Sequence, residues 1–224
     1  MINHLPNFLT CCNLICGCLG IIFLWEGSQI ETAYFVWAAC LFDFFDGFAA
    51  RLVKVSSPIG KELDSLADVV SFGVLPSLFM FKLLQFESPN EYLPYVALLI
   101  AVCSALRLAI FNVDETQSDS FKGLPTPANA LFLTGLPFLD YSFFDFVFSP
   151  VVLVLIIIAF SLLLVSRFEL FALKFKNFTW ADNKVRFTFL LLSVLLLVLF
   201  QFAAIPLIII LYLAGSLGVR VFSK

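Results

Sequence analysis

The sequence predicts an all-α integral membrane protein with about eight transmembrane helices. Hydrophobic residues occupy 62% of its 224 positions and charged residues 13%, and the mean hydropathy is +1.04. These values lie far outside the range of soluble globular proteins. The apolar residues form runs close to the roughly 20 residues that a helix needs to cross the hydrocarbon core. Acidic and basic connections alternate between the runs.

Eight apolar runs, bounded by charges, prolines or turn residues, are the candidate spans. They cover residues 8–25, 31–53, 60–85, 92–112, 124–139, 148–165, 187–201 and 203–219. The fifth and seventh are short. Acidic turns follow the first, third and fifth runs and carry Glu26 and Glu31, Glu87 and Glu91, and Asp140 and Asp145. Prolines mark the starts of two runs. Pro58 is well placed to open the third run, and Pro125 and Pro127 are well placed to fix the start of the fifth.

Basic residues occupy the other connections and the C-terminal end. They are Arg51, Lys54, Lys61, Arg107, Lys122, Arg167, Lys174, Lys176, Lys184, Arg186, Arg220 and Lys224. Cytoplasmic loops are enriched in Lys and Arg, so both termini and these connections are expected in the cytoplasm of a multi-pass protein of the cell membrane. Lys82 is the exception to this order. No cleaved signal peptide and no nucleic-acid partner are expected.

Four aspartates lie in segments that otherwise look bilayer-spanning, and their spacing places them on two helix faces. Side chains offset by three, four, seven and eight residues share one face of a helix. The first face consists of Asp43, Asp46, Gly47, Ala50 and Arg51. The next helix carries a stripe of Gly60, Asp64 and Asp68, each four residues apart. A turn over residues 54–59 would join the helices in a hairpin at the cytoplasmic boundary, so the four carboxylates are expected to converge.

Convergence of these acids is unfavourable unless some carboxylates are protonated or a cation lies among them, and a divalent ion is the more economical explanation. An acidic side chain at the centre of a membrane helix costs about 2.5 to 3.5 kcal/mol. Two carboxylates about 6 Å apart repel by roughly 3 kcal/mol at an effective dielectric constant of 20. All-oxygen ligation favours Mg²⁺, Mn²⁺ or Ca²⁺. The simpler alternative is that the acids line a water-filled vestibule or pair with Arg51, Lys54 and Lys61. Glu62 is out of register with the stripe, and for this residue the simpler alternative is preferred.

Small residues beside the acids indicate space for a ligand. Gly47, Ala50 and Gly60 would let a flat group approach the backbone, although close helix packing is the alternative explanation. Arg51 ends the first stripe with a planar cation suited to phosphate oxygens. Metal, guanidinium and space together favour a bound pyrophosphate, with the cation neutralising charge on a leaving phosphate.

The aspartate pattern resembles the signature of a known enzyme family. The motif Asp43-x2-Asp46-Gly47-x2-Ala50-Arg51-x8-Gly60-x3-Asp64-x3-Asp68 is similar, at every position, to that of the CDP-alcohol phosphotransferases. Within that family, LPNFLTCCNLICG, LDSLADVVSFGVLPS, RLAIFN and FKGLPTPA resemble segments of the phosphatidylserine synthase branch. The resemblance extends over about residues 5–135. Ile110 departs from it, because relatives tend to carry a basic residue there.

The resemblance implies transfer of the phosphatidyl group from CDP-diacylglycerol to L-serine, with release of CMP. It implies a six-helix core over residues 1–165, leaving a basic cytoplasmic loop at 166–186 and a two-helix extension at 187–224. It also implies Mg²⁺ or Mn²⁺ as cofactor, and a homodimer is the default expectation. By resemblance, the metal ligands are Asp43, Asp46, Asp64 and Asp68, with Asp68 also the general base. Gly47, Ala50, Gly60 and Arg51 would hold the CDP-diacylglycerol nucleotide and diphosphate.

Further polar residues are candidates for substrate contacts. A serine pocket must bind a carboxylate, and Arg107 on the fourth run is the first choice, followed by Lys122, while Asn112 would orient the site. The alternative explanation for Arg107 and Lys122 is the ordinary excess of basic residues on the cytoplasmic side of a membrane protein. This explanation is weaker for Arg107, which lies deeper in its span. Asn7, Thr10 and Asn13, three residues apart on the first helix, could touch the nucleotide or the groups around the metal. Helix capping explains Asn7 equally well.

Three other functions fit parts of this pattern. A phosphatidylglycerophosphate or phosphatidylinositol-phosphate synthase would need a denser basic pocket than Arg107 and Lys122 offer. A membrane prenyltransferase would need a second Asp-rich motif, which residues 128–224 lack. A divalent-cation transporter would use the acids as an ion site, but no convincing internal repeat supports it and Arg51 would have no role.

Overall fold

The computed structural model describes residues 4–53, 57–113, 121–170 and 179–222. Its α-helices are α1 (Leu5–Trp25), α2 (Gln29–Val53), α3 (Pro58–Asp68), α4 (Leu75–Glu87), α5 (Leu98–Val113), α6 (Thr126–Gly135), α7 (Tyr141–Phe144), α8 (Pro150–Val165), α9 (Trp180–Phe200) and α10 (Ala204–Phe222). A π-helix, η2 (Val69–Val74), joins α3 to α4. Short 3₁₀ helices are η3 (Leu93–Ala97), η4 (Leu136–Phe138), η5 (Asp145–Phe148) and η6 (Gln201–Ala203). An all-helical membrane protein is therefore confirmed, apart from one two-residue strand pair.

The hairpin of aspartate-bearing helices has a clear local cause. Ser57 is the N-cap of α3, and its hydroxyl accepts a hydrogen bond from the Gly60 N–H at 2.9 Å. Pro58 follows as the first helical residue, as predicted, where its missing N–H costs nothing. At the start of α6, Pro125 is the N-cap and Pro127 lies in the first turn, which confirms their structural role.

The third span departs from regular α-helix immediately after Asp68. The Leu75 N–H donates to the Val70 carbonyl, five residues back, which defines the wide turn of η2. Pro76 explains this departure, because a proline inside a helix removes one N–H and its ring clashes with the carbonyl four residues before it. The wide turn allows Pro58–Glu87 to continue as one span of 30 residues.

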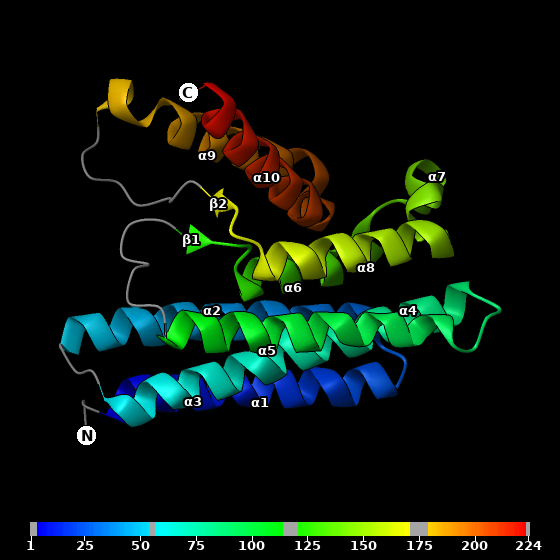
Figure 1. The fold of residues 1–224 in the computed structure, drawn as a ribbon, viewed down its shortest axis with the longest axis horizontal. Coiled ribbons are helices and arrows are strands. Elements are labelled where there is room, and N and C mark those ends of the chain that lie inside the picture. The colour runs from blue at the N-terminus through cyan, green and yellow to red at the C-terminus, as the bar shows by residue number, and fades with distance from the viewer. Residues whose placement is uncertain (1–3, 54–56, 114–120, 171–178, 223–224) are drawn as a thin grey trace.

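Helices α1 to α5 form one layer, with α6 and α8 packed on it and the α9–α10 hairpin beyond (Figure 1). α1 and α2 run antiparallel along most of their lengths. The start of α1, the end of α2, the start of α3 and the end of α5 all lie at the left-hand end in Figure 1. Strand β1 (Phe121–Lys122) pairs antiparallel with β2 (Glu169–Leu170), which ties the chain before α6 to the chain after α8.

Each of the eight predicted runs overlaps a helix in the described ranges. Among the residues that the structure describes, four helical stretches are long and apolar enough to cross a membrane: Leu5–Trp25, Pro58–Glu87, Leu93–Val113 and Asn183–Gly218. The number in these residues rises to five if the bent pair Thr126–Phe138 and Ser142–Phe148 counts as one span. The count of eight spans thus stays a prediction.

The fifth run, 124–139, is matched by one helical stretch, Thr126–Phe138. Within this stretch α6 ends at Gly135 and the chain continues as the 3₁₀ helix η4, because Pro137 cannot maintain α-helical hydrogen bonding. The chain bends by 111° after this stretch, between Phe138 and Ser142. Part of the predicted 166–186 loop lies outside the described residues, as do four of the predicted basic residues: Lys54, Lys174, Lys176 and Lys224.

Candidate metal and substrate site

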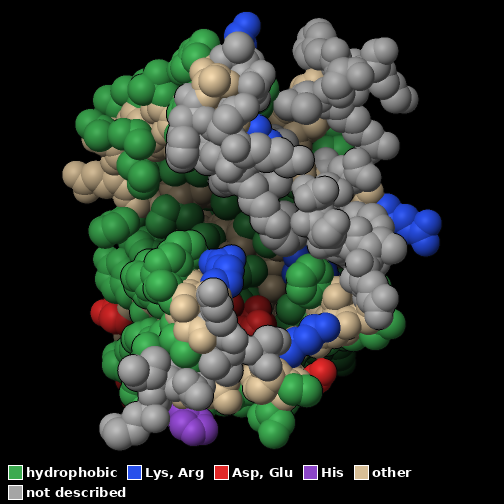
Figure 2. Space-filling view, turned by 90° about the vertical axis from the view of Figure 1, so that its left-hand side faces the viewer, with side chains coloured by type: hydrophobic (Ala, Val, Ile, Leu, Met, Phe, Trp, Pro, Cys, Tyr) green, Lys and Arg blue, Asp and Glu red, His purple; other side chains and the backbone are tan. Residues whose placement is uncertain are grey.

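Three carboxylates from α2 and α3 meet beside α1. Asp43 comes from α2, and Asp64 and Asp68 come from successive turns of α3. One oxygen from each of these side chains lies within 4.8 Å of the others. The predicted convergence is confirmed for this group, which we call the aspartate triad. Figure 2 looks onto this end of the bundle, where acidic side chains are visible near the middle with Lys and Arg side chains around them.

Asp46 is held by α1 instead of joining the triad. The Thr10 hydroxyl donates to Asp46 Oδ2 at 2.6 Å, and the Asp46 side chain is only 6% exposed. Thr10 is itself buried, with its hydroxyl also 3.1 Å from the Pro6 carbonyl oxygen. The short hydrogen bond fixes the orientation of the carboxylate toward α1. Sequence spacing placed Asp46 on the correct helix face but did not identify its partner.

Asn13 connects α1 to the triad. Its Nδ2 donates to Asp68 Oδ1 at 3.1 Å, and its backbone carbonyl accepts a hydrogen bond from the Ser71 hydroxyl at 3.0 Å. The Asn13 side chain is fully buried, and its Oδ1 has no hydrogen-bond partner among the described residues. Thr10 and Asn13 therefore contact the aspartates directly, while their predicted contacts with the nucleotide or the groups around the metal stay predictions.

The triad fits a hard divalent cation. Its donors are carboxylate oxygens, the ligands that Mg²⁺ and Mn²⁺ prefer, and no His or Cys belongs to the described cluster. Asp64 Oδ1 is buried and lacks a protein partner within the described ranges, as a ligand atom would. Two unit charges 4.8 Å apart repel by about 3 kcal/mol at an effective dielectric constant of 20. The arrangement is stable only if charge is neutralised, and a bound cation would do so.

The predicted nucleotide-binding residues line the end of the same hairpin. A Cβ added to Gly47 would meet nothing within 4 Å, so open space lies beside α2 one residue after Asp46. Ala50 is half-buried and Arg51 is exposed. Gly60 differs, since a Cβ there would come within 3.0 Å of Asn7 Oδ1 and Ser57 Oγ. Close packing of α3 on α1 is thus a sufficient reason for glycine at position 60.

Asn7 does not cap α1. His4 is the N-cap residue, and Asn7 lies within the first turn of the helix, half-buried beside Gly60. The capping interpretation of Asn7 was therefore wrong, because α1 begins earlier than the apolar run suggested. Its predicted contact with the nucleotide stays a prediction.

The predicted serine-binding residues have different surroundings in the structure. Arg107 on α5 is largely buried, interacts electrostatically with Asp68 and has a buried Nε without a hydrogen-bond partner in the part of the chain described. Asn112 holds helices together instead: its Nδ2 donates to Ser65 Oγ, and its carbonyl accepts from Lys61 Nζ, both at 2.8 Å. Lys122 belongs to β1, but its side chain lies outside what the structure describes.

Three polar residues near these helices were missed. Ser71 contacts α1 through Asn13, as described above. In α6, the side-chain polar atoms of Thr126 and Asn129 are buried, with no partner among the described residues. These residues could have been identified from the sequence as isolated polar residues in an apolar run. Such groups are unfavourable in a membrane unless they have a partner, so their presence indicates a contact. The adjacent prolines drew attention to helix initiation instead.

Comparisons with known proteins agree with this geometry. The sequence profile of the family described as CDP-alcohol phosphatidyltransferase matches residues 3–219. The chain is 33% identical over 171 residues to the CDP-diacylglycerol–serine O-phosphatidyltransferase of Bacillus subtilis, covering 75% of this chain and 89% of that protein.

Proteins of the same name from Methanocaldococcus jannaschii and Helicobacter pylori are 36% and 35% identical over 131 and 137 residues. These two matches cover 58% and 60% of this chain, but only 59% and 57% of the relatives' own lengths. The triad, its supporting α1 contacts and the nearly full-length profile match lead to one conclusion. The chain belongs to the CDP-alcohol phosphatidyltransferase family.

Proposed function

We propose that this chain is a phosphatidylserine synthase, which transfers the phosphatidyl group of CDP-diacylglycerol to the hydroxyl of L-serine and releases CMP. The observation that carries the proposal is the aspartate triad on the helices that bear the family motif, where one oxygen from each of three carboxylates lies within 4.8 Å of the others. The similarity to proteins named for the serine reaction favours serine as the acceptor.

Asp68 is proposed as the general base. A serine hydroxyl is a poor nucleophile until its proton is removed, so the base must lie within hydrogen-bond reach of it. Asp68 has one oxygen held by Asn13, which orients the carboxylate and leaves the other oxygen for the substrate proton. The serine oxygen then bonds to the phosphorus that carries diacylglycerol, and the bond from that phosphorus to the CMP oxygen breaks.

The remaining groups hold the substrates in place. A cation held by Asp43, Asp46, Asp64 and Asp68, either Mg²⁺ or Mn²⁺, would supply stabilisation for charge on the phosphates. Arg51 is proposed to contact the diphosphate, beside the space at Gly47. Arg107 is proposed to bind the serine carboxylate, because its guanidinium is buried close to Asp68 and retains an unpaired N–H in the described structure. The acyl chains remain in the bilayer.

The orientation of the protein in the membrane and its oligomeric state are also proposed. The triad would face the cytoplasm, since the end of the bundle that carries it also carries Arg51, Lys61 and Arg107. Eight helices would cross the cell membrane, and the enzyme would act as a homodimer. Light scattering of the purified protein in detergent measures the number of chains directly.

A single assay tests the reaction. Purified protein is given CDP-diacylglycerol, Mg²⁺ or Mn²⁺ and labelled serine, with glycerol 3-phosphate and inositol phosphate in parallel reactions. We expect CMP release that depends on serine alone. Release with glycerol 3-phosphate or inositol phosphate instead would assign the chain to another branch of the family.

The Asp68→Asn variant tests the base. It preserves the shape of the side chain and its contact with Asn13 but removes the proton acceptor, so turnover is expected to be abolished while nucleotide binding is largely retained. Glu62→Gln, six residues before Asp68 on the same helix and exposed, is the matched control and should keep full activity. Near-normal turnover by Asp68→Asn would rule out the base assignment.

A further inference from the structure

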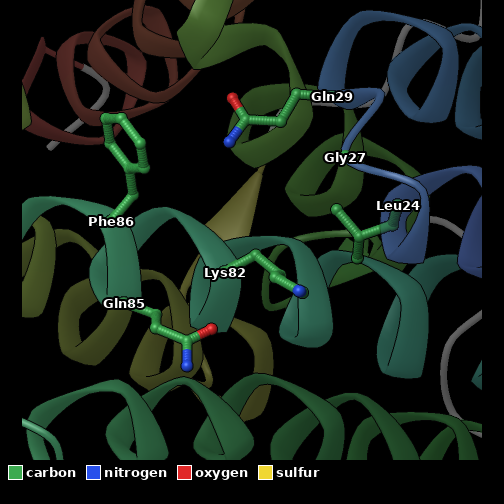
Figure 3. A pocket seen from close by; sticks show the side chains of 6 residues that line it. All are labelled: Leu24, Gly27, Gln29, Lys82, Gln85 and Phe86. Atoms are coloured by element: carbon green, nitrogen blue, oxygen red, sulfur yellow. The ribbon is translucent and has the colours of Figure 1, made fainter.

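A pocket lies at the end of the bundle opposite the aspartate triad. Its volume is about 470 Å³, and it lies between the turn that joins α1 to α2 and the last turns of α4. The lining residues are Leu24, Gly27, Gln29, Lys82, Gln85 and Phe86. Figure 3 shows the Gln29 amide extending from α2 toward Phe86, and the Lys82 side chain extending along α4 toward Leu24. The volume falls within the range of about 300 to 1,000 Å³ that is typical of small-ligand sites.

Lys82 provides the only charge among the lining residues. It is half-buried, and its ammonium lies 4.8 Å from the centroid of the Trp25 ring. Within the described ranges, Lys82 forms no ion pair with an acidic side chain. Contact with a ring face leaves N–H donors of the ammonium available, because a lysine carries three.

Membrane topology does not explain this lysine. The other described cations of the core lie toward the triad end, whereas the turns at the Lys82 end carry acids such as Glu26 and Glu91. Snorkelling explains how a lysine is tolerated near the end of a span. It does not account for the two amide side chains, Gln29 and Gln85, that line the same pocket. One cation and two amide donors around an open space are suited to an anion with several acceptor oxygens.

We propose that this pocket binds the phosphate-bearing headgroup of an anionic phospholipid. The rim favours a lipid over a free anion, because Phe86 is 85% exposed and the neighbouring Trp25 69% exposed. Both aromatic side chains stand where helices end, at the depth where such residues contact headgroups and the first acyl carbons. Lys82 would bind the phosphate, and the amides would donate to its oxygens or to the headgroup. This site is independent of the transfer reaction.

Trp25 is a built-in reporter for the test. The chain has three tryptophans, so Trp37→Phe and Trp180→Phe leave Trp25 alone beside the pocket. The protein is placed in vesicles in which either phosphatidylglycerol or phosphatidylcholine carries bromine on its acyl chains, and quenching of Trp25 fluorescence is measured. We expect the anionic lipid to bind about fivefold more tightly than the zwitterionic one, the factor that one lysine near a lipid surface contributes.

Two variants decide the outcome. Lys82→Gln should reduce the preference to about one, while Lys184→Gln, the same change at an exposed lysine of α9, should leave it unchanged. Equal quenching by the two lipids before substitution, or a preference that survives Lys82→Gln, would overturn the proposal. Loss of the preference on addition of millimolar inorganic phosphate would overturn the lipid assignment in favour of a free anion. Native mass spectrometry of lipids bound to the chain with all three tryptophans gives the same comparison if the reporter variant does not fold.

Discussion

At the scale of single residues, the site depends on hydrogen bonds from α1 that determine how the aspartates point. Asn13 donates to Asp68, and Thr10 donates to Asp46. Neither donor carries charge, so each orients a carboxylate without neutralising it. Thr10 and Asn13 are therefore positioning residues, because they determine which carboxylate oxygen faces the substrate.

Asn13→Ala should lower kcat without a matching change in KM for CDP-diacylglycerol. The variant removes a hydrogen bond to a charged group, which contributes about 1.5 to 3 kcal/mol, so turnover is expected to fall by about ten- to a hundredfold. Steady-state kinetics measure both constants. Asn90→Ala, the same change in a loop far from the triad, is the control. An Asn13→Ala enzyme with unchanged kcat would show that Asp68 needs no partner on α1.

Arg107→Lys should raise KM for serine more than it lowers kcat. Lysine keeps the charge but loses the planar pair of N–H donors that matches a carboxylate, so the two residues are not equivalent at such a site. We expect KM for serine to rise about tenfold, the effect of losing roughly 1.4 kcal/mol of binding, with KM for CDP-diacylglycerol unchanged. Arg167→Lys, at an exposed position after α8, is the control. Equal effects on both KM values would contradict a serine-specific role.

At the scale of elements, the close approach of α1 to η2 brings Asn13 within reach of Asp68. A Cβ on Gly17 would come within 3.0 Å of the Ser71 Cα, and one on Gly20 within 2.5 Å of Leu75 Cδ2. On the other side, a Cβ on Gly73 would lie 3.1 Å from Ser104 Cβ of α5. Small residues allow helices to pack this tightly in membranes, and the wide turn of η2 supplies the facing surface.

Gly17→Ala should therefore destabilise the protein and lower its activity together. The new methyl group meets backbone, which cannot move aside as a flexible side chain can, and overpacking of this kind costs about 1 to 3 kcal/mol. Thermal unfolding in detergent measures the loss as a lower Tm. Gly218→Ala in α10 is a matched control, because its Cβ would meet nothing within 4 Å. The prediction fails if both variants unfold at the same temperature as the unmodified protein.

At the scale of the whole molecule, acidic residues converge at a depth where helices α1, α2, α3 and α5 meet. Three carboxylates with oxygens within 4.8 Å of one another, two half-buried and one buried, destabilise the protein until a cation neutralises them. Stability and metal binding are consequently linked, since a ligand that binds only the folded state stabilises it.

Mn²⁺ or Mg²⁺ should raise the Tm of the metal-stripped protein, by the equivalent of about 2.7 kcal/mol at a concentration one hundred times the Kd. Asp64→Asn removes one repelling charge, so the metal-stripped variant is expected to be more stable than the metal-stripped parent but to gain little from added metal. Glu62→Gln should behave like the parent. Calorimetry with and without chelator checks both effects, and a metal-dependent rise that persists in Asp64→Asn would exclude that residue as a ligand.

The sequence by itself determined the membrane class, the overlap of each apolar run with a helix, and the helix faces that carry Asp43, Asp64 and Asp68. Hydropathy and four-residue spacing are local properties, so they can be read from the chain. Even the role of Pro58 followed from its position alone.

Only the tertiary structure decided which of these residues are partners. The Thr10–Asp46 and Asn13–Asp68 contacts join residues 36 and 55 positions apart, and no local period specifies them. The diversion of Asn112 to Ser65 likewise depends on how helices pack. Spacing fixes the direction of a side chain on its own helix, whereas the group that it meets is set by the neighbouring helix that lies against it.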